Sequence, residues 1–535
     1  MSLALLLLAP VLAPLAPQLP AAVPTKVRSA ALFKNGLAFV QRSGVAPADS
    51  AQARIDSLPV PTHGTFWVTA GNGAPALVSA VARKTERVER VAATNMMELL
   101  QANVGQKLTL FLGEKETIVG TLVSMPEPRP LEPEEIPRYG YMPQSIHSLL
   151  IFDTENSTTA VDPNRVSRIS AASGALNREF ERRHPGASLT LEFAAASKAP
   201  APFELRYLER GLTWAPSYSI DISEEGKALI SAKAEVIDEA EELAGATLQF
   251  VTGYPNLKFA HVADPLALRG DLEAFLNALG GTGSTQRGQV MSQSVASNSL
   301  YNDPGAATLP VAQEAAQGGV EDLFLYEQRD VTLARGERGL YPLFSKRVPC
   351  EHVYEWEIAE TTLDRRQGDS EGREPPQEEI WHSLRLTNDT GLPWTTAPAM
   401  TQKGGNILGQ DTLRYAAVGA KATVRITRAL DVQGEQSESE IARSRGAAQF
   451  YGSSYDLVTV HGQLRVTNYK REAVKLEIRR RIVGEVTKNP AKAEVVALAE
   501  GLKQVNPNTR LSWTVALEAG KPTTIEYEYT LYVRG

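Results

Sequence analysis

Apolar and polar residues alternate most clearly at the end of the chain. Trp513, Val515 and Leu517 share one face of an extended segment that leads into a turn at 518–521. After the turn, one face takes Ile525, Tyr527, Tyr529, Leu531 and Val533. Polar residues such as Thr514 and Glu526 lie between them, which is typical of sheets with one solvated side. The pattern therefore predicts antiparallel sheets packed face to face.

The stretch 205–255 shows the same alternation around a Trp-Ala-Pro-Ser-Tyr corner. Trp214 is expected in the core, because Pro216 forces an extended backbone and an indole buries a large apolar area. Ile220 and Ile222 alternate with polar residues in the segment that follows. A turn at 238–243 is predicted before the next strand. We expect the later half of the chain to be built onto this stretch, as a β-sandwich over 185–265 and 321–535.

Shorter strands are predicted before it. Asn35-Gly36 lies between two apolar runs, which is a strong hairpin signal because both positions favour positive φ. Residues 25–90 are therefore expected to form a small N-terminal β domain. A short helix at 94–102, capped by Thr94 or Asn95, precedes several glycine-punctuated strands. Residues 91–175 thus resemble a small SH3- or Sm-like barrel, with a Pro-rich loop at 126–143. The loops of this barrel carry acid rather than base, which favours a structural or assembly role.

Two polar segments interrupt the strands. Residues 280–319 are rich in Gly, Ser, Gln, Asn and Ala, and predict a flexible polar insert. A short helix is expected just before it, at 271–279. Residues 433–454 are polar and bear glycine, and predict another long loop. The similar sequences LRLTN (384–388) and LRVTN (464–468) are interpreted as a shared hairpin requirement rather than a true internal repeat.

The first residues resemble a secretory signal. Residues 1–24 hold a short apolar run, five prolines and small residues, and are interpreted as a signal peptide. The run is too short to span a bilayer, and no later stretch is apolar enough to do so. We therefore expect a periplasmic or secreted protein that is not transmembrane.

Composition narrows the chemistry. The 535 residues are 43% hydrophobic and carry a formal net charge of −7, which argues against nucleic acid as a partner. The single cysteine, Cys350, allows no disulfide framework and is interpreted as a small buried residue. The seven histidines are scattered, and no motif of a hydrolase, phosphate-binding loop or metal site is present. The sequence nominates no catalytic, cofactor-binding or metal-ligating residue, although distant strands could still bring metal ligands together.

Several ordered blocks of the sequence resemble one family. They are GLTWAPSY with ATLQFVTGYPN, EDLFLYEQRDVTLARGE (321–337), HSLRLTNDTGLPW (382–394), HGQLRVTNYKREAVKLEI (461–478) and the closing 508–533. Over about 200–535 the chain resembles a bacterial family of unknown function that includes the mucoidy inhibitor A-like proteins. The resemblance implies a β-rich, usually exported protein without an established activity. The central coiled-coil helices of some relatives are absent, and the polar insert is a further departure.

These observations favour an exported, non-enzymatic protein that binds a protein or polysaccharide partner of the cell envelope through the edges or loops of its sheets. The alternative is a hydrolase or carbohydrate-active enzyme whose site is assembled from separated β loops. A third interpretation makes the small barrel an oligomerisation module. The sequence does not specify an oligomeric state.

Overall fold

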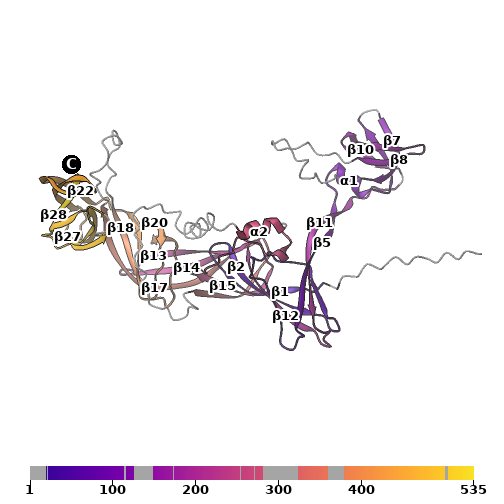
Figure 1. The fold of residues 1–535 in the computed structure, drawn as a ribbon, viewed down its shortest axis with the longest axis horizontal. Helices are drawn as coiled ribbons and strands as arrows, with labels where there is room; N and C mark the ends of the chain where they lie inside the picture. Colours follow the sequence, from indigo (N-terminus) through magenta and orange to yellow (C-terminus); the bar gives the residue numbers. More distant parts are fainter. Residues whose placement is uncertain are drawn as a thin grey trace, which may run out of the picture.

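The computed structural model describes residues 20–535 except 21, 114–115, 126–148, 173, 254, 270–271, 281–322, 359–378 and 500–503. The protein is mainly β, with 66% of residues in strands and 5% in helices, so the predicted fold class is confirmed. The sheets follow one another along an elongated molecule (Figure 1). The predicted signal peptide at 1–24, the Pro-rich loop at 126–143 and the polar insert at 280–319 lie largely or wholly outside the described residues.

The first sheet has six strands in the order β16-β15-β1-β2-β12-β4. They are β1 (Thr25–Leu32), β2 (Leu37–Ala46), β4 (Trp67–Ala70), β12 (Ala201–Arg210), β15 (Leu243–Thr252) and β16 (Phe324–Leu333). A second sheet in the order β3-β11-β5 shares its core and contains β3 (Gln52–Ile55), β11 (Glu179–Phe193) and β5 (Leu77–Ala92).

The small N-terminal domain predicted over 25–90 differs from this arrangement. Its hairpin is present, with Gly36 at φ +82°. However, β1 pairs with β15 and β2 pairs with β12, so the N-terminal strands share a sheet with residues from the middle of the chain. The physical reason is burial of apolar surface. The apolar faces of these short strands are shielded from water only when β11, β12 and β15 complete the core.

A separate module follows at the end of the long β5–β11 ribbon (Figure 1). Helix α1 (Met96–Ala102) begins at Asn95, whose side chain accepts a hydrogen bond from the amide of Glu98. A five-stranded sheet then runs in the order β10-β6-β7-β8-β9 around its own core. The strands are β6 (Lys107–Leu112), β7 (Glu116–Ser124), β8 (Leu150–Asp153), β9 (Thr158–Val161) and β10 (Val166–Ala171), with a 3-10 turn η2 (Pro163–Arg165). In the described residues β9 and β10 are the open edges of this sheet.

The largest sheet runs in the order β20-β19-β13-β14-β17-β24-β27-β26, and β18 and β21 branch from β17. Its strands are β13 (Leu212–Asp221), β14 (Lys227–Asp238), β17 (Arg338–Ile358), β18 (Ile380–Thr387), β19 (Ala397–Lys403), β20 (Asn406–Leu413), β21 (Lys421–Arg428), β24 (Val474–Val483), β26 (Glu494–Ala499) and β27 (Asn508–Leu517). The last sheet, β22-β23-β28-β25, contains β22 (Val432–Phe450), β23 (Ser453–Asn468), β25 (Glu485–Lys488) and β28 (Pro522–Arg534). Trp214 and Trp513 are 1% and 5% exposed, so both lie in cores as predicted.

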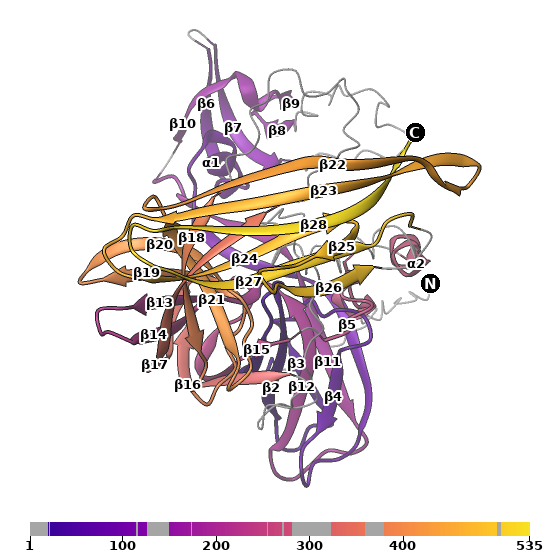
Figure 2. The same cartoon turned by 90° about the vertical axis from the view of Figure 1, so that its left-hand side faces the viewer.

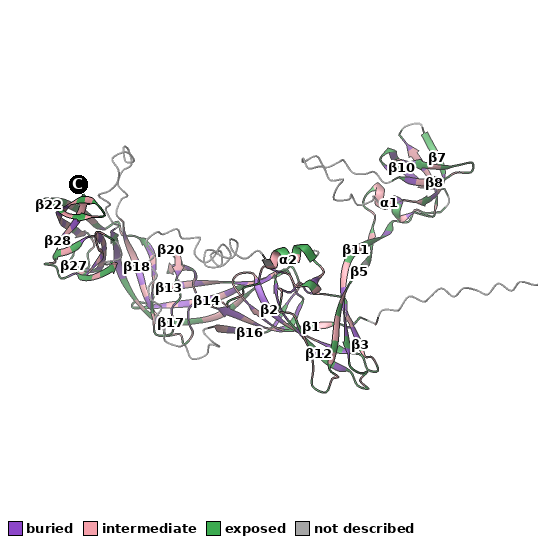
Figure 3. Cartoon of the chain, in the orientation of Figure 1, coloured by how far each residue is buried: buried purple, intermediate pink, exposed green. Residues whose placement is uncertain are grey.

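Two predicted elements have different outcomes. The helix expected at 271–279 is present as α2 (Leu272–Gly280), which follows a 3-10 turn η3 (Pro265–Ala267) and lies with most of its residues exposed (Figure 3). The long loop expected at 433–454 is wrong, because these residues form most of β22 and its hairpin with β23. The polar sequence hid the strand, since β22 is held by pairing with β23 and buries few of its own side chains.

Four successive units of this chain follow one path. Each unit has three neighbouring antiparallel strands, namely β1-β2-β12, β13-β14-β17, β17-β18-β21 and β22-β23-β28. In the last three units the chain leaves the second strand, adds an antiparallel pair of strands to the preceding unit and returns as the third strand. These pairs are β15–β16 on β1, β19–β20 on β13 and β24–β27 on β17, and the first strand of each pair joins the first strand of the preceding unit in parallel.

A buried polar side chain marks the same point in the last three units. Asp238, Asn388 and Asn468 each end or follow the second strand, and all three are 0% exposed. In each case the side-chain Oδ1 accepts a hydrogen bond from the backbone amide two residues later, at 3.0–3.1 Å. Oδ1 of Asp238 also accepts the amide of Glu241, at 2.9 Å. Each backbone carbonyl accepts the amide of a glycine just before the third strand, at 2.7, 2.6 and 2.7 Å. The LRLTN and LRVTN sequences therefore occupy equivalent places in consecutive structural units, so the requirement that they share belongs to a repeated path of the chain.

Candidate functional site

Two of the scattered histidines meet on neighbouring strands. Nδ1 of His352 on β17 lies 2.9 Å from Nε2 of His382 on β18, and the His382 ring stacks on Tyr354 with centroids 4.7 Å apart. Burial, and then the charge of His352, lowers the pKa of His382 to about 4. Within the described residues, no group of three or more His, Cys, Asp or Glu side chains could hold a metal ion. The pair is therefore a neutral, hydrogen-bonded contact at physiological pH.

Cys350 lies on the same face of β17. It is partly buried, and burial raises the pKa of its thiol to about 11. A nucleophilic cysteine needs a lowered pKa, because the thiolate is the reactive form. The raised pKa therefore disfavours the thiolate form of Cys350.

A carboxyl group with a raised pKa, that of Glu209, lies inside the first core. Arg42, Glu209 and Glu241 are 9%, 4% and 4% exposed, and Tyr207 donates a hydrogen bond to Glu241. The Arg42 guanidinium lies 3.3 Å from the Glu241 carboxylate. Burial first, and then the Glu241 charge, raises the pKa of Glu209 to about 9. With one guanidinium beside two carboxyl groups, a protonated Glu209 leaves this enclosed cluster electrically balanced.

A wide, open hollow of about 970 Å³ lies where α1 meets the β5–β11 ribbon. Side chains of both charges line it, and Arg182 pairs with Glu98 at 2.7 Å. Neighbouring residues on the ribbon are also paired across the strands, as Arg183 is with Glu86 at 3.5 Å. The first contact joins α1 to the ribbon, and the second is an exposed attraction between its two strands.

The junction between β17 and β24 shows how this molecule joins one unit to another. Tyr354–Ile358 of β17 pair in parallel with Leu476–Arg480 of β24. On the inner face, Tyr354 and Trp356 pack with Leu476 and Ile478 in one core. The edges of both strands are thereby closed, and their apolar residues are sealed from water.

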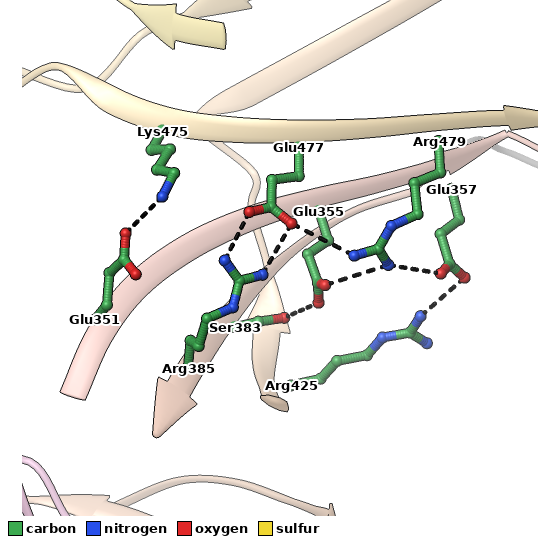
Figure 4. Close-up of polar contacts among 9 residues, drawn as sticks. All are labelled: Glu351, Glu355, Glu357, Ser383, Arg385, Arg425, Lys475, Glu477 and Arg479. Carbon is green, nitrogen blue, oxygen red and sulfur yellow. Dashed lines mark hydrogen bonds and ion pairs between the residues drawn. The ribbon is translucent and has the colours of Figure 1, made fainter. Parts of the chain in front are cut away.

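The outer face of the same junction carries a ladder of charges (Figure 4). Arg385 of β18 binds Glu477 of β24 through two hydrogen bonds of 2.7 and 2.8 Å, which cross the intervening β17. Lys475 binds Glu351 at 2.7 Å, and Arg479 lies 3.6 Å from Glu355. Arg479 also contacts Glu357 and Glu477, each at 3.4 Å. The remaining contacts join Ser383 to Glu355 and Arg425 to Glu357. The acidic and basic side chains of this ladder are equal in number (Figure 4). The ladder therefore fixes the register of three strands rather than attracting a ligand of one charge.

Strand β22 presents a different edge. It pairs with β23 from Val432 to Phe450, and it forms the border of its sheet in the part of the chain that the structure describes (Figure 2). Ser439–Arg443 are exposed, and Ile441 is 53% exposed. The register shifts at Ile441 and again between Ser444 and Ala448. A long edge strand offers a row of backbone donors and acceptors to an added strand.

The inner face of β22 is anchored by Glu438. Its carboxylate accepts hydrogen bonds of 2.8 Å from Arg480 and 2.8 Å from Tyr527, and Arg480 is only 1% exposed. Gly462, opposite Glu438, leaves room for the Tyr527 ring, because a Cβ there would lie 2.2 Å from that ring. The backbone at Glu438 is therefore fixed from inside while its outer edge faces solvent.

Sequence reasoning missed this edge, since no apolar alternation marks residues 432–450. The short signal that could have found it is the LRVTN sequence at 464–468, which places a second strand and hence predicts a first strand before it. No family model matches the sequence, and no curated protein matches it. No helix within the described ranges is long and apolar enough to cross a membrane.

Proposed function

We propose that this chain is an exported bacterial protein that binds a protein of the cell envelope or the extracellular space without catalysing a reaction. The single observation that carries the proposal is the edge of β22, a 19-residue strand that borders its sheet and is largely exposed. Export is supported by the sequence of residues 1–24. Strand addition to a sheet edge gives affinity through main-chain hydrogen bonds, and it needs no deep pocket.

The architecture supports a binding role in a second way. The four units are joined by the shared strand β17 and by parallel pairing, so the β22 edge is held at one end of an elongated molecule (Figure 1). The small module lies near the other end, on the β5–β11 ribbon. A rigid scaffold that holds a recognition edge away from other parts of the molecule suits a protein that bridges two components.

The test combines localisation with crosslinking in the producing bacterium. A photo-crosslinking amino acid at Ser439 on the β22 edge is compared with the same group at Glu526, which lies on the interior strand β28 of the same sheet. We expect the tagged protein in the periplasm or medium, and a defined crosslinked partner from position 439 alone. A purely cytosolic protein, or equal crosslinking from both positions, would contradict the proposal.

A further inference from the structure

The four units do not all have the same surroundings at their first strand. Strands β1, β13 and β17 each accept a parallel strand from the following unit. Strand β22 is the first strand of the last unit, and no strand lies on its outer edge in the described chain. The units differ only in whether the outer edge of the first strand is paired. The strands that pair with β1, β13 and β17 therefore indicate what kind of segment could pair with β22.

The accepting segment falls at a fixed distance from the buried polar residue. In the second unit, Tyr218 accepts the added strand and lies opposite Ala232, six residues before Asp238. In the third unit, Tyr354 does so and lies opposite His382, six residues before Asn388. The corresponding residue before Asn468 is Gly462, and its partner on β22 is Glu438. The accepting segment of β22 therefore begins at Glu438 and extends to about Arg443.

We infer that Glu438–Arg443 of β22 accepts an extended segment of another protein, which runs parallel to β22 and forms the first strand of a hairpin. This inference rests on the proposed function and gives its partner a direction and a register. Each internal donor turns back as an antiparallel second strand, in β16, β20 and β27. Charged side chains and a bulge at Ile441 make β22 a poor template for its own kind, which favours a heterologous segment over a second copy.

The internal donors also define the chemistry of the partner. Their inward residues are Leu248 and Phe250, Ala399 and Thr401, and Leu476 and Ile478, and all six are 0% exposed. Polar residues alternate with them, as Glu477 does between Leu476 and Ile478. The partner segment is thus expected to alternate apolar and polar residues, with its apolar side chains extending the core that contains Val458 and Val460.

The probe for the test is a synthetic peptide that copies residues 397–413, the β19–β20 hairpin, which is a natural parallel donor of this fold. It is added to the full-length chain, and backbone hydrogen exchange is followed by mass spectrometry. We expect exchange at 438–443 to slow by about tenfold or more, because added main-chain hydrogen bonds must open before exchange. A scrambled peptide serves as control. No protection by the hairpin peptide would show that the bulge at Ile441 closes this edge, and would overturn the inference.

Direction is read by disulfide capture in a Cys350→Ala background. Ser437→Cys lies just before the accepting segment and Ala442→Cys lies near its far end, and the peptide carries a cysteine at its amino end. Parallel pairing predicts capture by Ser437→Cys and little by Ala442→Cys. The reverse preference would mean antiparallel addition, which overturns the inference but leaves the proposed edge-binding function intact. Parallel capture without a partner crosslink from position 439 in cells would instead contradict the proposed function alone.

Discussion

Strands β17 and β22 hold the same place in two successive units, but among the described residues only β17 is paired along both edges. Tyr354 and Trp356 of β17 are 5% and 0% exposed beside β24, whereas Ser439 and Glu440 of β22 are exposed. Apolar residues therefore alternate along β17, whose outer edge is paired with another strand of the same chain. A polar sequence at the same place keeps an open edge soluble, because unpaired apolar edges promote aggregation. The comparison separates strands that build the molecule from a strand available to a partner.

The largest expected contrast is a side-chain truncation on each strand. Trp356→Ala removes a fully buried indole from the core shared by β17 and β24, and should cost about 3–5 kcal/mol. Ile441→Ala on β22 should change stability by no more than about 0.5 kcal/mol, since the residue is exposed. Hydrogen exchange of β17 and β24 measures the local opening free energy. This is preferable to a global unfolding transition, because a chain with several units need not unfold in one step. Equal effects of the two substitutions would remove the distinction between these strands.

A second contrast concerns the buried amide that organises each later unit. Nδ2 of Asn388 donates to the carbonyls of Leu392 and Ala416 at 2.9 and 3.0 Å, and Oδ1 accepts from Thr390. Asn388→Ala leaves these groups without their partner and should cost about 2–3 kcal/mol. Asn406→Ala, at an exposed position on β20, is the matched control and should be nearly neutral. Thermal unfolding compares the two, and a neutral Asn388→Ala would show that the turn does not depend on this side chain.

A smaller effect is expected in the charge ladder. Glu477→Gln weakens the two-bond contact with Arg385 and should cost about 1–2 kcal/mol near pH 7. The hydrogen bond from Arg385 lowers the pKa of Glu477 below its ordinary 4.5, so its stabilisation is present above pH 4.5 and is lost as pH falls through the lowered value. The difference between variant and parent should therefore shrink in acid. Glu435→Gln on exposed β22 is the control, and an equal cost for both would contradict a special role for the ladder.

The outcome of the sequence predictions follows the same physical division. Strands with one buried face, such as 525–533 and 218–222, were predictable because burial imposes a period of two on the residues. The burial of Trp214 was predictable because a large indole is most stable in a core, and the Asn95 cap of α1 because asparagine is favoured at the start of a helix. The long hairpin at 433–454 was not, since cross-strand backbone bonds need no particular side chain. The parallel joints between units were not either, because they bring together residues more than a hundred positions apart.

The candidate edge was still less accessible to sequence reasoning. The β22 edge stands out only by comparison with β1, β13 and β17, the first strands of the other units. The structure is needed to show that each of these three pairs in parallel with a strand of the following unit. The LRLTN and LRVTN sequences marked two of the equivalent places. The third place carries Asp238 as a substitution for the asparagine, and the residues before it differ as well, so the sequence alone did not reveal the repeat.

That substitution gives the smallest and most specific prediction. Asp238 accepts the amides of Ala240 and Glu241 as the two asparagines accept theirs, but its Oδ2 is buried without a hydrogen-bond partner in the described chain. Burial raises the pKa of Asp238 to about 6, so the folded state holds a proton that the unfolded state releases, and stability falls as pH rises from about 4 to about 6. Asp238→Asn supplies a neutral donor where Asn388 and Asn468 have one, and should stabilise the second unit by about 1 kcal/mol at pH 7. The gain should diminish below pH 4, where Asp238 is protonated and can itself donate. Thermal unfolding at pH 4 and pH 7 measures both values, and a destabilised variant at pH 7 would show that the second unit does not share the turn chemistry of the other two.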